Sequence, residues 1–210
     1  MEEGAIKFNL QYTREGLPDN VSLDALNRWR STLRERALIG QDPDRYDGYG
    51  YGNVSQRINP RKSAREHRSF IISGTQTGHL DILDRNHYTL VESYDISSDT
   101  VVARGPVKPS SESLTHGMIY DMDEHILVVL HVHSPDIWCN ATALGVPITD
   151  ADVPYGTPGM AHEVERLFKD TDVRDKRIFS MGGHLDGIVS FGTTAQEAGE
   201  VLLNALAACK

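Results

Sequence analysis

The sequence predicts an α/β protein with a three-layer α/β/α arrangement, in which helices cover both faces of a β-sheet. Residues 126–132 form a continuous apolar run of strand length, which is typical of a strand buried on both faces. Helical patterns lie at the beginning, in the middle and at the end of the chain, between segments that alternate like strands. A central, doubly buried strand in a sheet with helices on both sides is the simplest arrangement with this order.

The first part of the chain is expected to contain a polar segment and the start of a single domain. Residues 1–21 are polar and are expected to be irregular. Residues 22–210 are expected to form one domain, because no repeat, linker or abrupt change of charge divides them. Ser22 is expected to cap a first helix, which ends before Gly40.

Strands and capped helices alternate over the rest of the chain. A capping residue marks the start of three helices: Ser110 for a helix to about Met122, Thr157 ahead of Pro158, and Thr194 for a helix that runs to the C-terminus. The strands are expected at 53–58, 69–73, 88–94, 100–104, 126–132, 178–181 and 187–191.

Charge and composition exclude several classes of protein. The 210 residues include 21 Lys and Arg against 30 Asp and Glu, and the net charge of −9 argues against sequence-independent binding to nucleic acid or anionic lipid. The longest apolar run is far shorter than the roughly 20 residues of a membrane helix, and the acidic N-terminus argues against export. Two cysteines, Cys139 and Cys209, suit a reducing compartment. We therefore expect a cytoplasmic protein that binds neither nucleic acid nor a membrane.

Three histidines are candidates for a metal site. His131 and His133 are two residues apart at the end of the buried strand, so both point to one face of the sheet. The pair is equally consistent with two histidines that only make hydrogen bonds at a strand end. His184, in a glycine-rich connection between two expected strands, is the candidate third ligand. Three neutral imidazoles with open positions are typical of a catalytic zinc site.

The segment around Ser110, Ser111 and Glu112 has two interpretations. It is consistent with an ordinary capped helix start, because serine caps helices and an acidic residue suits the first turn. The free N–H groups and hydroxyls of a helix start also suit a phosphate, beside which Glu112 is a candidate general base. Asn53 and the loop 73–78 provide further small residues and backbone donors, although either segment taken alone is more typical of an ordinary turn.

Taken in order, these motifs resemble the class II aldolase/adducin family over about residues 22–206. The residues that carry the resemblance are Gly52-Asn53-Val54-Ser55, Thr77-Gly78, Pro109-Ser110-Ser111-Glu112 with His116, His131-Val132-His133-Ser134-Pro135, and His184 with Gly187.

The resemblance implies a fold with a central mixed, largely antiparallel sheet, a homotetramer and a complete set of site residues. The residues that match metal ligands, with Zn²⁺ the usual ion, are His131, His133 and His184. Glu112 matches the acidic residue that transfers protons. The residues that match substrate phosphate-binding positions are Asn53, Thr77, Gly78, Ser110 and Ser111.

Two departures from the family pattern leave alternatives open. Leu185 and Asp186 separate His184 from Gly187, so a different alignment makes Asp186 the third ligand. His184 is favoured, because a third imidazole suits a zinc ion that two other imidazoles already bind. The prototype of the family also has a C-terminal tail with a catalytic tyrosine, for which this sequence has no counterpart. Tyr155 is a candidate substitute proton donor.

The resemblance therefore implies a metal-dependent lyase that reversibly cleaves a ketose 1-phosphate by aldol cleavage, through a zinc-stabilised enediolate with Glu112 as general acid and base. The substrate is expected to be a sugar phosphate or a related keto compound. A dehydratase, decarboxylase or epimerase with the same site is the alternative among enzymes. A non-catalytic adducin-like scaffold is a weaker alternative, because the metal ligands and the glutamate are retained.

Overall fold

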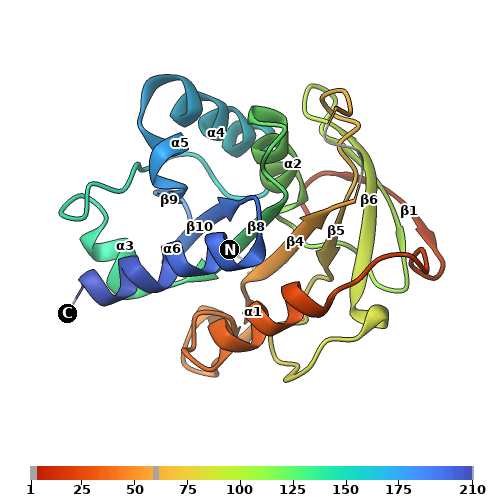
Figure 1. Cartoon of the computed structure of the whole chain (residues 1–210), viewed down its shortest axis with the longest axis horizontal. Helices are drawn as coiled ribbons and strands as arrows, with labels where there is room; N and C mark the ends of the chain where they lie inside the picture. The colour runs from red at the N-terminus through yellow and green to blue at the C-terminus, as the bar shows by residue number, and fades with distance from the viewer. Residues whose placement is uncertain (1–3, 59–61, 210) are drawn as a thin grey trace.

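The computed structural model describes residues 4–58 and 62–209, and within them helices cover both faces of an eight-stranded sheet (Figure 1). The strand order is β1-β7-β6-β5-β4-β8-β10-β9. β1 pairs with β7 in parallel and the other neighbours are antiparallel, so the expected mixed, largely antiparallel sheet is confirmed. The strands are β1 (Asn9–Arg14), β4 (Asn53–Arg57), β5 (Phe70–Ser73), β6 (Tyr88–Asp95), β7 (Thr100–Gly105), β8 (Val128–His133), β9 (Ile178–Ser180) and β10 (Gly187–Gly192).

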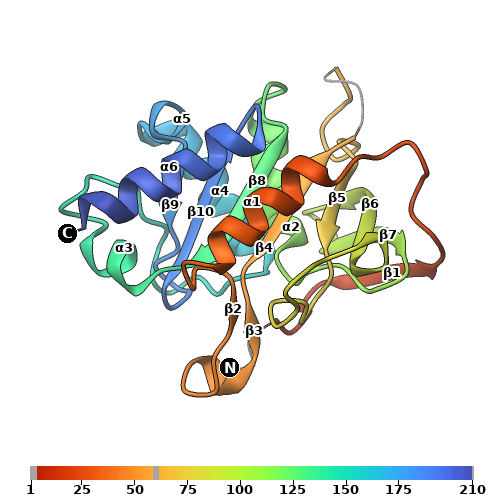
Figure 2. The ribbon, with the colours of Figure 1, turned by 60° about the horizontal axis from the view of Figure 1, so that its bottom comes forward.

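The helices form the two outer layers, which confirms the three-layer α/β/α prediction. Figure 2 shows α1 and α6 crossing the same face of the sheet. On that face Leu33 and Leu202 pack in one hydrophobic core with Leu130, while on the other face Ile119 packs in a second core with Val129. The first face carries α1 (Asp24–Arg34), α3 (Pro135–Asn140) and α6 (Ala195–Ala208), and the second carries α2 (Ser113–Met122), α4 (Pro158–Asp170) and α5 (Val173–Lys176).

The central strand β8 is buried along its whole length, as its apolar sequence predicts. It lies between β4 and β10, and the register places Asn53 opposite His131 and Gly187 opposite His133. β4 and β10 therefore place Asn53 and Gly187 next to the two histidines.

The expectation that residues 1–21 are irregular is wrong for part of this segment, because Asn9–Arg14 forms β1. β1 is an edge strand with mostly exposed side chains, and backbone hydrogen bonds to β7 hold it in place. A polar strand of this kind has little hydrophobic signal in the sequence. That residues 22–210 form one domain stays a prediction.

The helix caps are confirmed at two of the four expected positions. The prediction that Ser22 caps the first helix is wrong, because Leu23 is the N-cap residue of α1 and no side-chain hydrogen bond caps that helix. Thr157 Oγ1 accepts a hydrogen bond of 3.3 Å from Met160 N, and Thr194 Oγ1 accepts one of 3.1 Å from Glu197 N. The prediction that Ser110 caps α2 is wrong, because the helix begins at Ser113 and Glu112 is its N-cap residue. This shift places the Glu112 side chain at the helix end.

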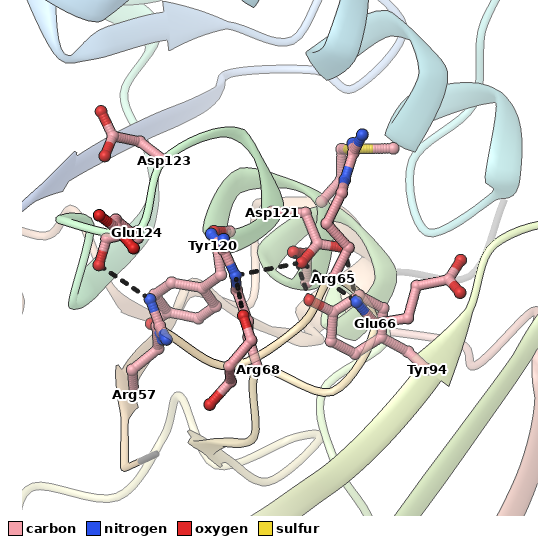
Figure 3. Close-up of polar contacts among 12 residues, drawn as sticks. Arg57, Arg65, Glu66, Arg68, Tyr94, Tyr120, Asp121, Asp123 and Glu124 are labelled. Atoms are coloured by element: carbon pink, nitrogen blue, oxygen red, sulfur yellow. Dashed lines mark hydrogen bonds and ion pairs between the residues drawn. The ribbon is translucent and has the colours of Figure 1, made fainter. Parts of the chain in front are cut away.

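A buried polar cluster holds the C-terminal end of α2 against the loop before β5 (Figure 3). The Asp121 carboxylate accepts hydrogen bonds of 3.0 and 3.2 Å from the backbone N–H of Glu66, and lies 3.7 Å from Arg68 Nε. Arg68 also donates to the carbonyl of Tyr120. Burial raises the pKa of Asp121. The cluster fixes the helix that presents Glu112 at its opposite end.

A two-stranded ribbon of β2 (Gly40–Gln41) and β3 (Gly50–Tyr51) stands beside the main sheet, with the short 3-10 helix η1 (Tyr46–Gly48) between its strands. Among the helices of residues 4–58 and 62–209, none has the length and apolar character needed to cross a membrane.

Candidate active site

The three histidines singled out in the sequence meet at one end of the central strand. His131 and His133 point to the same face of β8, and His184 joins them from the connection between β9 and β10. One potential ligand atom of each side chain lies within 4.8 Å of the other two, and all three side chains are buried. One metal ion is therefore within reach of all three imidazoles.

The surroundings of His131 prepare it to bind a metal ion. Its Nδ1 lies 3.2 Å from the carbonyl oxygen of Ile188, which can only accept a hydrogen bond, so Nδ1 carries the proton. Nε2 therefore has the lone pair, and this buried atom has no hydrogen-bond partner among the described residues. Burial, reinforced by the nearby imidazoles, lowers the pKa of His131 and His133 well below the ordinary value. Neutral imidazoles with one nitrogen oriented by a carbonyl are what a divalent ion requires.

Glu112 lies beside these histidines. Its Oε1 is 3.7 Å from His184 Nδ1, and the two side chains are only 3% and 4% exposed. Thr115 Oγ1 donates a hydrogen bond of 2.9 Å to the other carboxylate oxygen, Oε2. The carboxylate is thus oriented with one oxygen toward the histidine cluster, where it can exchange a proton with a molecule bound there.

The structure separates the two candidates for the third ligand. His184 is in the cluster, whereas Asp186 Oδ2 accepts a hydrogen bond of 2.6 Å from Tyr46 Oη and lies 3.8 Å from Arg45. Asp186 therefore lies outside the group of residues that could hold a metal ion together. A Cβ on Gly183 would lie 2.1 Å from the carbonyl oxygen of Val153, so only glycine allows the connection to pack this closely.

The remaining candidate residues come together around one polar pocket next to Glu112. All five residues matched to phosphate binding line this pocket: Asn53, Thr77, Gly78, Ser110 and Ser111. Asn53 is buried, and its Oδ1 has no hydrogen-bond partner within the described residues. A Cβ on Gly78 would lie 2.3 Å from the carbonyl of Gly40, which explains the glycine there. Hydroxyls, an amide and glycine backbone suit an anion such as a phosphate.

The rings of two tyrosines pack against two of the histidines. Tyr155 stacks on His184 with ring centres 4.2 Å apart and planes at 22°, and Tyr46 meets His133 edge-on at 4.6 Å. Both tyrosines line a cleft of about 440 Å³ that reaches His184. The sequence does not predict the contact of Tyr46 with His133, because the only signal for this residue is its position in the Tyr- and Gly-rich segment 46–51.

The other four histidines considered from the sequence lie outside the cluster. His116 is buried and makes a hydrogen bond of 2.7 Å between its Nδ1 and Ser55 Oγ. Burial lowers the pKa of His116 to about 3. His79, His125 and His162 are more exposed and form local contacts with nearby residues.

The chain belongs to the family described as the class II aldolase and adducin N-terminal domain, whose model matches residues 43–210. The first 42 residues, which include β1 and α1, lie outside the match. No curated protein matches the chain.

Several solved structures share the fold. L-fuculose-1-phosphate aldolase from Thermus thermophilus is 16% identical, with a TM-score of 0.60 over 89% of this chain and 89% of that chain. Sugar-phosphate aldolase from Thermotoga maritima is also 16% identical, with a TM-score of 0.56 over 88% and 94%. YgbL from Escherichia coli is 18% identical, with a TM-score of 0.58 over 86% and 83%. At these identities the likeness establishes the fold and leaves the reaction to be argued from the site.

Proposed function

We propose that this protein is a metal-dependent lyase that reversibly cleaves the carbon–carbon bond of a ketose 1-phosphate. The observation that carries the proposal is the position of the Glu112 carboxylate, 3.7 Å from His184, between the buried histidine cluster and the polar pocket. Aldol chemistry requires a stabilised oxyanion and a proton-transfer group at the same place. The two solved aldolases named above support the same choice.

His131, His133 and His184 would hold the metal ion, and Zn²⁺ is the ion that we propose. When bound, it supplies Lewis-acid stabilisation for the negative charge that develops on the substrate oxygens. The three side chains offer imidazole nitrogens in a buried setting, which suits a divalent transition metal.

Glu112 would act as the general acid and base. Its Oε1 faces the histidines, so a proton moves between this oxygen and the substrate carbon or hydroxyl bound beside them. Thr115 holds Oε2 and thereby limits rotation of the carboxylate. Burial at the N-cap of α2 keeps the carboxylate away from bulk water.

The polar pocket would bind the substrate phosphate through Asn53, Thr77, Gly78, Ser110 and Ser111. These residues are neutral hydrogen-bond donors, so the acidic net charge of the chain does not prevent anion binding. The remaining carbons would extend into the cleft beside Tyr46 and Tyr155, where Tyr155 is the candidate second proton donor.

A decarboxylase or epimerase of a sugar phosphate or keto acid is the second candidate. The structure of YgbL is described with aldolase, epimerase and decarboxylase as candidate activities, and all of these reactions use an oxyanion next to a proton-transfer group. A dehydratase has the same requirements. The retained histidine cluster and Glu112 argue against a purely structural, adducin-like role.

We further propose a cytoplasmic homotetramer. The family resemblance supports the tetramer. The two cysteines are free, which agrees with a reducing compartment.

Aldehyde release from a panel of ketose 1-phosphates tests the proposal. The Zn²⁺-loaded protein is expected to release an aldehyde and dihydroxyacetone phosphate from at least one ketose 1-phosphate. Glu112→Gln should lower kcat by about 10²-fold or more, because general acid–base groups contribute on this scale. Glu200→Gln, on the exposed surface of α6, is the matched control. Turnover of a keto acid or an epimerisable sugar phosphate, without aldehyde release, would replace the lyase with the second candidate.

A further inference from the structure

Among the described residues ahead of β1, Gly4 lies against the polar pocket, although it is outside the residues matched to the family. Gly4 lines the pocket, and its carbonyl oxygen accepts a hydrogen bond of 2.9 Å from Thr75 Oγ1. Gly4 has a φ of +74°, and a Cβ there would lie 2.3 Å from Gln76 Nε2. The backbone of the segment is therefore in direct contact with the loop that carries Thr77.

Three residues farther on, Lys7 contacts Tyr155, one of the two tyrosines beside the histidines. Its Nζ donates a hydrogen bond of 2.9 Å to the carbonyl oxygen of Tyr155 and lies 3.2 Å from the centre of the Tyr155 ring. The same ring stacks on His184. The next residue, Gly156, contacts the polar pocket, because a Cβ there would lie 2.7 Å from the carbonyl oxygen of Ser111. Lys7 thus contacts a residue that stacks on the histidine cluster and that directly precedes a glycine packed against the polar pocket.

In the described part of the chain, the polar pocket lacks a positive charge to balance a bound anion, and Lys7 can supply one. The described residues that line the pocket are glycines, neutral polar residues and Glu112, and they include neither lysine nor arginine. A phosphate next to the Glu112 carboxylate meets repulsion between like charges. An ammonium group nearby offsets this repulsion and supplies charge-assisted hydrogen bonds. Lys7 has such a group on a flexible stem, which can turn from the Tyr155 carbonyl toward an anion.

We propose that Lys7 binds the anionic phosphate group of the substrate, and that residues 4–7 therefore form part of the substrate site. This inference rests on the proposed phosphate-binding function of the polar pocket.

Calorimetric titration of inorganic phosphate into the full-length, Zn²⁺-loaded protein tests the proposal. Lys7→Gln should raise the Kd for phosphate about tenfold, because a hydrogen bond to a charged group is lost, while Lys7→Arg should restore most of the affinity. Lys169→Gln is the matched control, because Lys169 is an exposed lysine on α4 that pairs with Glu165. The affinity difference between wild type and Lys7→Gln should shrink at high salt.

The outcomes separate this inference from the proposed function. Phosphate binding by the wild type with an unchanged Kd in Lys7→Gln would overturn the role of Lys7 and leave the polar pocket as a phosphate site. No phosphate binding by the wild type would overturn the phosphate site itself and the role of Lys7 with it. A tenfold loss in Lys7→Gln, with rescue by arginine and no change in Lys169→Gln, would establish the role of Lys7.

Discussion

Tyr46 donates a hydrogen bond of 2.6 Å from its hydroxyl to Asp186 Oδ2 and at the same time places its ring edge-on against His133. The two hydrogen-bonded residues are 140 positions apart in the sequence. The contact joins the β2–β3 ribbon to the connection that carries His184, and Arg45 donates a further hydrogen bond of 2.6 Å to the Tyr46 hydroxyl. The ribbon therefore covers one side of the histidine cluster.

Tyr46→Phe should distinguish the contribution of the Tyr46 hydrogen bond from that of its ring contact with His133. Loss of the hydroxyl removes this hydrogen bond from the Asp186 carboxylate, which is 12% exposed, so the free energy of unfolding should fall by about 1–2 kcal/mol. The bound metal should remain, because the ring still covers His133. Tyr46→Leu is the comparison variant and should also weaken metal binding. Urea unfolding and metal analysis measure both effects; equal stability of Tyr46→Phe and wild type would show that the hydrogen bond contributes nothing.

Metal stoichiometry should distinguish His184 from Asp186 as the third ligand. After dialysis against a weak chelator, the wild type should retain about one divalent ion per chain, and His131→Ala and His184→Ala should lose it, because a catalytic site with three protein ligands loses affinity sharply when one is removed. Asp186→Asn should keep the ion, since Asp186 is directed toward Tyr46 and Arg45. Loss of metal from Asp186→Asn together with retention by His184→Ala would reverse the assignment.

The parts of the site that local patterns encode could be predicted from the sequence. Alternation along β8 predicts that His131 and His133 share a face, and the apolar run predicts that this strand is buried. The start of α2 is less well predicted, because Ser110 is a good cap by residue type, but its hydroxyl accepts a bond of 3.3 Å from Glu112 N in a turn ahead of the helix.

The residues that surround the site could not be predicted in the same way. Tyr46 with Asp186, and Lys7 with Tyr155, are pairs separated by 140 and 148 positions. Such contacts depend on how the ribbon, the edge strand and the loops pack, and no local periodicity reports on that packing. β1 brings Lys7 into place, and its polar sequence lacks the pattern of a buried strand.

Acid should destabilise the metal-free protein in part through His116. Burial lowers the pKa of His116 from its ordinary value of 6.5 to about 3. Between these values the unfolded state binds a proton that the folded state does not bind, so the free energy of unfolding falls as pH falls from 6.5 toward 3. One such group contributes a slope of about 1.4 kcal/mol per pH unit. His131 and His133 act in the same direction.

His116→Gln should therefore make the pH dependence of stability shallower in this window, by about one proton's contribution. Urea unfolding in the presence of a chelator, at several pH values between 3 and 8, measures the slope. The variant loses the hydrogen bond to Ser55, so it should be less stable than wild type at pH 8, and the two curves should converge on acidification. Two parallel curves would show that His116 is protonated equally in both states.

Removing the Asp121 carboxylate should destabilise the protein through the polar cluster at the end of α2 (Figure 3). Asp121→Ala leaves the backbone N–H of Glu66 and the largely buried Arg68 without this acceptor, so the free energy of unfolding should fall by about 3 kcal/mol. Asp123→Ala is the matched control two residues away. Its carboxylate is 38% exposed and pairs with the exposed His125, which predicts a loss of about 1 kcal/mol or less. Equal losses in the two variants, measured by urea unfolding, would show that burial does not increase the contribution of the Asp121 cluster to the free energy of unfolding.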